Sequence, residues 1–225
     1  MDLSEFLRYL SQHQQDGGRL PSLSRLSEEL GISVATLREQ LEVARALGLV
    51  DVRPKTGIRK LAYTFKPAVI KSLSYAAALE PDYFFHAFSD LRNHIESAYF
   101  YQAVQLLTNE DHAELRRLVE RANEKLSGAP IQIPHGEHRE LHLLIYRRLN
   151  NPFVSGILEA YWEAYEAVGL DVYTDLTYLH TVWAYHQRMV EAICAGNSSE
   201  GYRALMEHTD LLSLRVITVK RQNFE

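Results

Sequence analysis

Three histidines lie within eight residues in the segment "HGEHRELH", at positions 135, 138 and 142. His138 and His142 are four residues apart, so on a helix they share one face, with Cβ atoms about 5–6 Å apart. Neutral imidazoles bind Zn²⁺, Ni²⁺, Cu²⁺ or Fe²⁺, and two of them at this spacing can reach one ion. A solvated helix face or a pair of polar core positions would space histidines in the same way. His135 lies nearer a loop, and we leave it outside the predicted ligand set.

The chain as a whole has the composition of an ordinary globular protein. Of its 225 residues, 46% are hydrophobic and 24% are charged. No apolar run approaches the length of a membrane span, and the N-terminal segment "MDLSEFLRYL" lacks the apolar core of a signal peptide. Cys194 is the only cysteine, which excludes an intrachain disulfide. We therefore expect a cytoplasmic protein with no membrane partner.

Charge is unevenly divided along the chain. Residues 1–62 hold 9 Lys and Arg against 8 Asp and Glu, a net charge of +1. Residues 63–225 hold 15 against 21, a net charge of −6, which completes the total of −5. A near-neutral segment ahead of a larger acidic one permits nucleic-acid binding at the N-terminal end without establishing it.

The elements of the first 65 residues follow the pattern of a winged helix-turn-helix. Apolar spacing predicts helices over 3–15, 23–30 and 34–47. Ser22 and Ser33 stand at N-cap positions, and Gly31 and Gly48 end the second and third helices. The segments "LVDVR" and "IRKLAYTF" alternate as strands around "PKTG", which predicts a two-stranded wing. We predict a DNA-binding domain over residues 1–65.

Such a domain places the first turns of the second helix of the motif, here the helix predicted over 34–47, in the major groove. The wing would carry basic residues to the phosphates or into the minor groove. Arg38 is the strongest candidate for a groove contact, because a guanidinium can donate two parallel hydrogen bonds to a guanine or a phosphate. A small helical domain that packs against a protein partner is the alternative interpretation. The predicted DNA-binding residues are Ala35, Thr36, Arg38, Arg53, Lys55, Gly57 and Arg59.

The remaining residues, 66–225, predict an antiparallel all-helical bundle, so the expected fold class is mainly α. No strand-like alternation follows residue 65. Pro67 and Pro152 mark helix starts and Gly169 marks a helix end. Short loops make sequential helices neighbours in the bundle. Helices are expected at about 67–79, 82–107, 109–127, 136–149, 152–168, 175–195 and 198–220.

Several short segments carry a resemblance to a known family. In the N-terminal part they are "LPS" at 20–22, "LSEELGIS" at 26–33, "LRE" at 37–39, "LGLV" at 47–50 and "RPKTG" at 53–57. In the C-terminal part they are "LRNHIESAYFYQAV" at 91–104, "HRELHLLIYRRLNNP" at 138–152 and "HQRMVEAICAGNSSEGYRALMEH" at 186–208. In this order they resemble the GntR family of transcription regulators, in its FadR-like branch with an FCD domain. The chain departs from the family at Val34, where an arginine is common, and at His138, where an aspartate is usual.

The resemblance implies a metal site and an effector pocket in the helical domain. The ion would be divalent, with Zn²⁺ or Ni²⁺ favoured by imidazole ligands. Arg92 would face the pocket and pair with a small carboxylate effector. An ion pair with Glu96, one helical turn on, is the alternative for this arginine. The implied metal ligands are His138, His142, His186 and His208.

The resemblance also implies a function. The chain would form a homodimer, bind double-stranded operator DNA and respond to a small organic acid, as a repressor rather than an activator. No enzymatic activity is expected from it. Two other functions stay open: a metal-dependent helical enzyme, and an interaction module whose DNA-binding head is degenerate.

Overall fold

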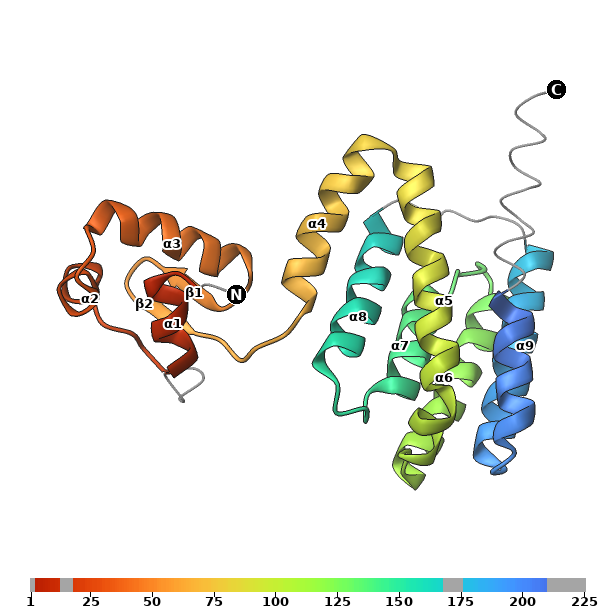
Figure 1. The fold of residues 1–225 in the computed structure, drawn as a ribbon. Helices are drawn as coiled ribbons and strands as arrows, with labels where there is room; N and C mark the ends of the chain where they lie inside the picture. Colours follow the sequence, from red (N-terminus) through yellow and green to blue (C-terminus); the bar gives the residue numbers. More distant parts are fainter. Residues whose placement is uncertain (1–2, 13–17, 168–175, 210–225) are drawn as a thin grey trace.

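The computed structural model describes residues 3–12, 18–167 and 176–209. In the described part of the chain, an N-terminal head of helices and a small sheet precedes a bundle of longer helices, and an irregular segment connects the two (Figure 1). This architecture confirms the mainly α fold class, with a winged helix-turn-helix followed by an all-helical bundle. Within the described ranges, no helix is both long and apolar enough to cross a membrane.

The head folds around caps and turns that the sequence encodes locally. Ser22 and Ser33 accept hydrogen bonds from the backbone N–H groups of Arg25 and Thr36 and so cap two helices. Gly31 ends the first of these with a φ of 66°, a left-handed conformation that glycine adopts without a steric penalty. The elements are α1 (Glu5–Gln12), α2 (Leu23–Leu30), α3 (Val34–Ala46), β1 (Val50–Arg53) and β2 (Gly57–Lys60). Their buried core comprises Phe6, Leu10, Leu20, Leu26, Leu37, Leu41, Ala44, Val50 and Ile58.

The wing is shorter than the sequence predicts. Strands β1 and β2 pair antiparallel, with Val50 opposite Lys60. The second strand was expected to continue to Phe65, but β2 ends at Lys60 because its partner β1 begins only at Val50, after the turn that follows α3. The first helix is also shorter than the predicted 3–15: α1 ends at Gln12, and residues 13–15 lie outside the described part.

The bundle begins at residue 66 and follows the predicted order of helices. Asn151 caps α8 by accepting a hydrogen bond from Phe153 N at 3.1 Å, and Thr108 and Asp111 form a capping box at the start of α6. Residues 198–209 are also helical, and the rest of the predicted helix 198–220 lies outside the described residues. The labelled helices are α4 (Lys66–Leu79), α5 (Pro81–Gln105), α6 (Asn109–Ser127), α7 (His135–Tyr146), α8 (Pro152–Ala167) and α9 (Leu176–Cys194).

Helix α7 is the central element of the bundle, because it packs against α5, α6 and α8. It ends at Tyr146 rather than at the predicted residue 149. The two arginines that follow, Arg147 and Arg148, both form ion pairs with the buried carboxylate of Asp111 on α6. Most of the C-terminal half of α7 is buried, so a solvated helix face is the wrong interpretation for His142.

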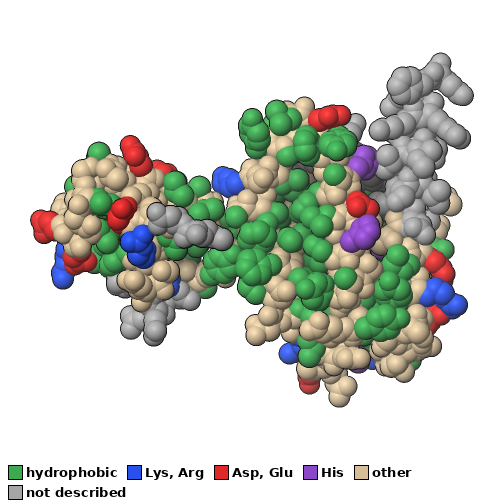
Figure 2. Space-filling view, viewed as in Figure 1, with side chains coloured by type: hydrophobic (Ala, Val, Ile, Leu, Met, Phe, Trp, Pro, Cys, Tyr) green, Lys and Arg blue, Asp and Glu red, His purple; other side chains and the backbone are tan. Residues whose placement is uncertain are grey.

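The connection between head and bundle rests on α8. A Cβ on Gly156 would lie 2.7 Å from Cβ of Phe65, so the start of α4 approaches α8 as closely as a glycine allows. The Phe65 ring meets the edge of Phe153 at a centroid distance of 5.2 Å, and Lys66 Nζ lies 2.7 Å from a carboxylate oxygen of Glu163. Figure 2 shows hydrophobic side chains gathered at this junction. The link from the head therefore packs directly on α8.

Candidate metal centre and nucleic-acid interface

The four predicted ligands come together in the bundle. His138 and His142 extend from α7, His186 from α9 and His208 from the helix at 198–209. One ring nitrogen from each lies within 4.8 Å of those of the other three. His142, His186 and His208 are buried, and His138 is partly exposed. Because α7 and α9 both pack against α6, residues more than 40 positions apart in the sequence meet in one place.

Three ring nitrogens of this cluster lack the hydrogen bonds that buried polar atoms normally have, as far as the described residues show. His138 Nε2, His186 Nδ1 and His208 Nδ1 have no partner among the described residues. His142 Nε2 lies 3.1 Å from His186 Nε2. A buried polar atom without a partner costs about 1–3 kcal/mol, and an ion bound among these nitrogens would remove that cost. A divalent ion held by imidazoles fits this donor set.

Three of the four histidines are held in the neutral form, which is the form that can bind a cation. Desolvation by burial, and after it the neighbouring imidazoles, hold the pKa of His138 and His186 well below the usual 6.5. Burial followed by His142 has the same effect on the pKa of His208. These rings are therefore neutral at pH 7, and a neutral imidazole keeps the lone pair that a metal requires.

Aromatic side chains enclose the histidines. The ring of Trp162 on α8 lies 4.7 Å from that of His138 and 5.2 Å from that of His142, between centroids. Trp183 on α9 lies 4.9 Å from His186. A cavity of about 30 Å³, room for one or two water molecules, borders His138, Tyr165, Tyr178, Trp183 and His208. The tryptophans were not predicted, since an aromatic residue in a helix is most often core.

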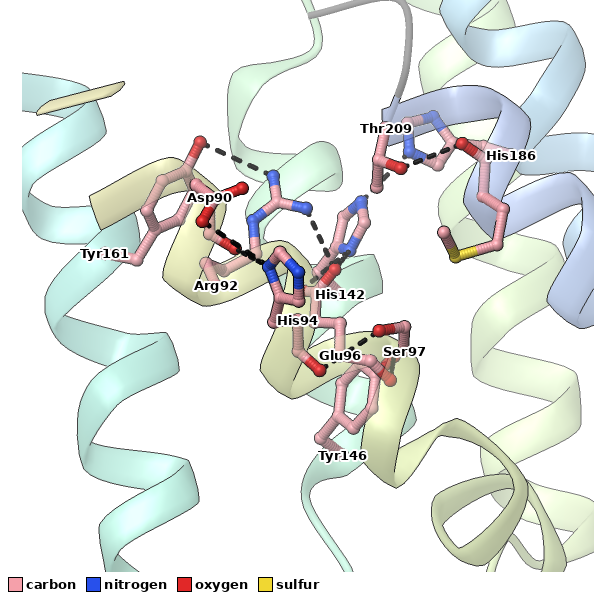
Figure 3. A network of polar contacts seen from close by, with 11 residues as sticks. Asp90, Arg92, His94, Glu96, Ser97, His142, Tyr146, Tyr161, His186 and Thr209 are labelled. Atoms are coloured by element: carbon pink, nitrogen blue, oxygen red, sulfur yellow. Dashed lines mark hydrogen bonds and ion pairs between the residues drawn. The ribbon is translucent and has the colours of Figure 1, made fainter. Parts of the chain in front are cut away.

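Arg92 lies beside the cluster, in the ion pair that the sequence left open as its alternative. Its Nη1 donates to Glu96 Oε2 at 2.9 Å, and both side chains are 0% exposed. Its Nη2 lies 3.4 Å from the hydroxyl of Tyr161, whose ring centroid is 4.5 Å from the guanidinium carbon. Figure 3 shows Arg92 between Tyr161 and Glu96, with His142 next to the carboxylate.

Glu96 joins this pair to the histidines, and the sequence had not assigned it that role. Both of its carboxylate oxygens lie 3.1 Å from Nδ1 of His142. Burial raises the pKa of Glu96, but Arg92 and then His142 outweigh that effect and lower the pKa below 4.5. Glu96 is therefore charged at pH 7, and its charge is balanced by that of Arg92. The spacing of four residues between Arg92 and Glu96 was the only local signal of this arrangement.

The predicted DNA-binding residues lie on the surface of the head. Ala35, Thr36 and Arg38 are exposed in the first two turns of α3, while Val34 is half-buried. The Thr36 hydroxyl lies 2.9 Å from that of Ser33, so it takes part in the helix cap. The structure thus presents Arg38 as the exposed basic group at this end of the helix.

In the wing, Arg53, Lys55 and Arg59 are exposed, and Arg53 Nε is paired with Asp51 at 2.7 Å. A Cβ on Gly57, whose φ is 77°, would lie 3.4 Å from Nε of Arg19. Arg19 is joined to Arg59 by an isolated β-bridge, so it adds a basic side chain that the wing prediction missed.

Comparisons with known proteins agree with this architecture. The family model of the FCD domain matches residues 88–211, or 124 of the 225 residues. The chain is similar to a Streptococcus agalactiae GntR structure at 16% identity, with a TM-score of 0.69 over 92% of this chain and 94% of that one. It is similar to Escherichia coli McbR/YncC at 21% identity, with a TM-score of 0.50 over the full length of both chains. No curated protein sequence matches it.

The family match covers more than half of the chain, including all four histidines and Arg92. The structural neighbours, at these low identities, support the fold of the head and the bundle. Enzymatic function is excluded by the family to which the matched domain belongs, as expected from the sequence. The chain belongs to the FCD domain family, in the FadR-like branch of the GntR regulators, and is a DNA-binding transcription regulator.

Proposed function

We propose that the protein is a homodimeric repressor that releases its operator when a small carboxylate binds beside a divalent metal ion. Residues 1–65 would bind double-stranded DNA, and residues 66–225 would hold the metal, the effector and the partner copy. The observation that carries this proposal is the convergence of four histidine side chains, three of them with a buried ring nitrogen that has no partner among the described residues.

The donor set favours a metal of borderline hardness. All four groups are imidazoles, and His138 stands where the family usually has an aspartate. Imidazole suits Zn²⁺ and Ni²⁺, whereas Mn²⁺ prefers oxygen ligands. The ion would act as a Lewis acid for the effector's carboxylate. His138, His142, His186 and His208 would hold it.

An anionic effector fits the charge of the site. His138, His186 and His208 are neutral, and the charges of Arg92 and Glu96 cancel, so a bound divalent ion would bring two uncompensated positive charges into a buried place. A carboxylate would offset one of them. Nε of Arg92 has no partner within the described part of the chain, so this guanidinium retains a donor for the same carboxylate. The small cavity beside His138 and His208 favours a ligand of few atoms.

Helix α8 offers a route from this site to the DNA-binding heads. At its middle it places Trp162 against His138 and His142. Near its start it carries Gly156, which contacts the segment that leads from the head. A shift of α8 on effector binding would move the heads, provided that the effector binds one position of α8 better than the other.

Metal analysis tests the proposed site. We expect the purified protein to carry about one ion per chain, as four-ligand sites of this kind do, and the His142→Ala variant to have lost it. The matched control is His180→Ala, which removes an exposed histidine of α9 and should leave the metal content unchanged. Equal metal content in the wild type and in His142→Ala would remove the metal from the proposal.

DNA binding is tested at Arg38. We expect Arg38→Ala to weaken binding to the DNA upstream of the protein's own gene by about 1–3 kcal/mol, the value of one bidentate base contact. Fluorescence anisotropy at several salt concentrations measures the affinity, because phosphate contacts make it salt-dependent. Arg116→Ala on the exposed face of α6 is the control. An unchanged affinity for Arg38→Ala would count against the assigned interface, and no DNA binding by the wild type would favour the interaction module.

A further inference from the structure

We propose that Glu96 is a positioning residue of the metal centre, which accepts a hydrogen bond from Nδ1 of His142 and thereby directs the lone pair of Nε2 toward the other three histidines. The inference rests on the proposed metal site and adds a residue to it. It concerns the tautomer and the orientation of one ligand, which the four ligands by themselves do not determine.

Neighbouring residues contact both the side chain and the backbone of Glu96. Its Oε2 accepts a hydrogen bond from Arg92 Nη1 at 2.9 Å, and both carboxylate oxygens lie 3.1 Å from His142 Nδ1. Its backbone carbonyl accepts a hydrogen bond from the hydroxyl of Tyr146 at 2.9 Å. Arg92, Glu96 and His142 are all buried. Glu96 is therefore held at its carboxylate by Arg92 and at its backbone by Tyr146, while the carboxylate contacts the imidazole.

The position of the carboxylate distinguishes orienting the ring from binding the ion. Nε2 of His142 faces Nε2 of His186 at 3.1 Å, so this edge of the ring points into the cluster. Glu96 contacts Nδ1, the other ring nitrogen, and is absent from the group of convergent ligand atoms. A carboxylate in that place increases the basicity of the ligating nitrogen and locks the ring, as carboxylate–histidine–metal arrangements do.

The hydrogen-bonding chemistry selects one tautomer. A charged carboxylate has acceptors only, so the His142 atom that meets it must carry the proton. In the neutral ring the proton on Nδ1 leaves Nε2 without one, and Nε2 is then available for a metal. An amide in place of the carboxylate can donate or accept, so it would no longer impose this choice.

A purely structural role is the competing explanation, in which Glu96 only balances the charge of Arg92. A comparison of Glu96→Gln with Tyr146→Phe distinguishes this structural role from the positioning of His142. Tyr146→Phe also removes a buried hydrogen bond to Glu96, but from its backbone carbonyl, and leaves the carboxylate in place. The two variants therefore perturb the same residue, and only one of them changes the group that faces His142.

Titration of the metal-free proteins with Zn²⁺ against a chromophoric chelator supplies the first readout. We expect Glu96→Gln to bind Zn²⁺ about 10- to 100-fold more weakly than the wild type, whereas Tyr146→Phe keeps the wild-type affinity. Circular dichroism confirms that each variant is folded. Wild-type affinity in a folded Glu96→Gln protein, or equal losses in both variants, would overturn the inference.

The tautomer of His142 is the second readout, and it needs neither metal nor a substitution. Long-range ¹H–¹⁵N correlation spectra of the metal-free wild type are expected to show His142 protonated on Nδ1. Protonation on Nε2 would overturn the inference even if Glu96→Gln failed to fold. A wild type that binds no Zn²⁺ yet shows the Nδ1 proton would refute the proposed metal function and leave only the orientation of His142 by Glu96.

Discussion

Replacement of Arg92 by methionine is expected to lower the free energy of unfolding of the metal-free protein by about 3–5 kcal/mol. Arg92 and Glu96 are both 0% exposed and are joined at 2.9 Å. Without the guanidinium, the carboxylate would remain buried beside His142 with no cation to balance it. A buried charge that has lost its partner is destabilising because its desolvation is no longer offset by an opposite charge. Chemical denaturation followed by circular dichroism measures the free energy of unfolding of the variant and of the wild type.

Two comparisons show whether the uncompensated charge is the cause. The double variant Arg92→Met with Glu96→Gln removes that charge and is expected to regain much of the lost stability. Arg121→Met removes an arginine that is 42% exposed and pairs with Glu114 and Glu140 at 3.4 Å. It should cost about 0–1 kcal/mol, as exposed pairs do. If Arg92→Met cost no more than Arg121→Met, the buried pair would not be a main source of stability.

The second large effect is a steep loss of stability of the metal-free protein as the pH falls below about 6.5. The pKa of His138, His186 and His208 is held well below 6.5 in the folded chain, chiefly by burial. The unfolded chain therefore takes up protons first, so the stability is full above pH 6.5 and is lost as the pH falls. Each such histidine contributes a slope of about 1.4 kcal/mol per pH unit, and three together about 4.

Denaturant unfolding at a series of values from about pH 7.5 to about pH 5.5 measures this slope. Glu96 does not interfere, because its lowered pKa provides stability that is lost only below its ordinary value of 4.5. Adding Zn²⁺ should raise the stability and move the loss to lower pH, since protons and metal compete for the same nitrogens. The control His94→Gln removes a histidine that is 74% exposed and should leave the slope unchanged. A flat profile across this range would mean that the three rings are not buried as neutral groups.

Much of the fold could be predicted because its signals are local. A serine at an N-cap, a glycine with positive φ and an asparagine before a helix act within a few residues of their own position. Ser22, Ser33, Gly31 and Asn151 accordingly stand at the predicted helix ends. The spacing of His138 and His142 likewise follows from the helical repeat alone. The second strand was predicted too long because its length depends on β1, its partner.

The candidate site was less predictable than the fold, because its contacts join residues far apart in the chain. The four histidines could be proposed as a set from the resemblance to a family, but the sequence does not state that His142 faces Glu96, 46 positions away. Nor does it state that Arg92 is stacked on Tyr161, 69 positions away.

Sequence by itself predicted the order of the helices and several of their caps, and the resemblance to a family added the histidines proposed as metal ligands. Only the tertiary structure decided which ring nitrogen faces the cluster, which charge balances Arg92, and that α8 contacts both the histidines and the segment from the head. The reason is physical: the caps and periodicity belong to one stretch of backbone, whereas these contacts depend on how neighbouring helices are packed and rotated against one another.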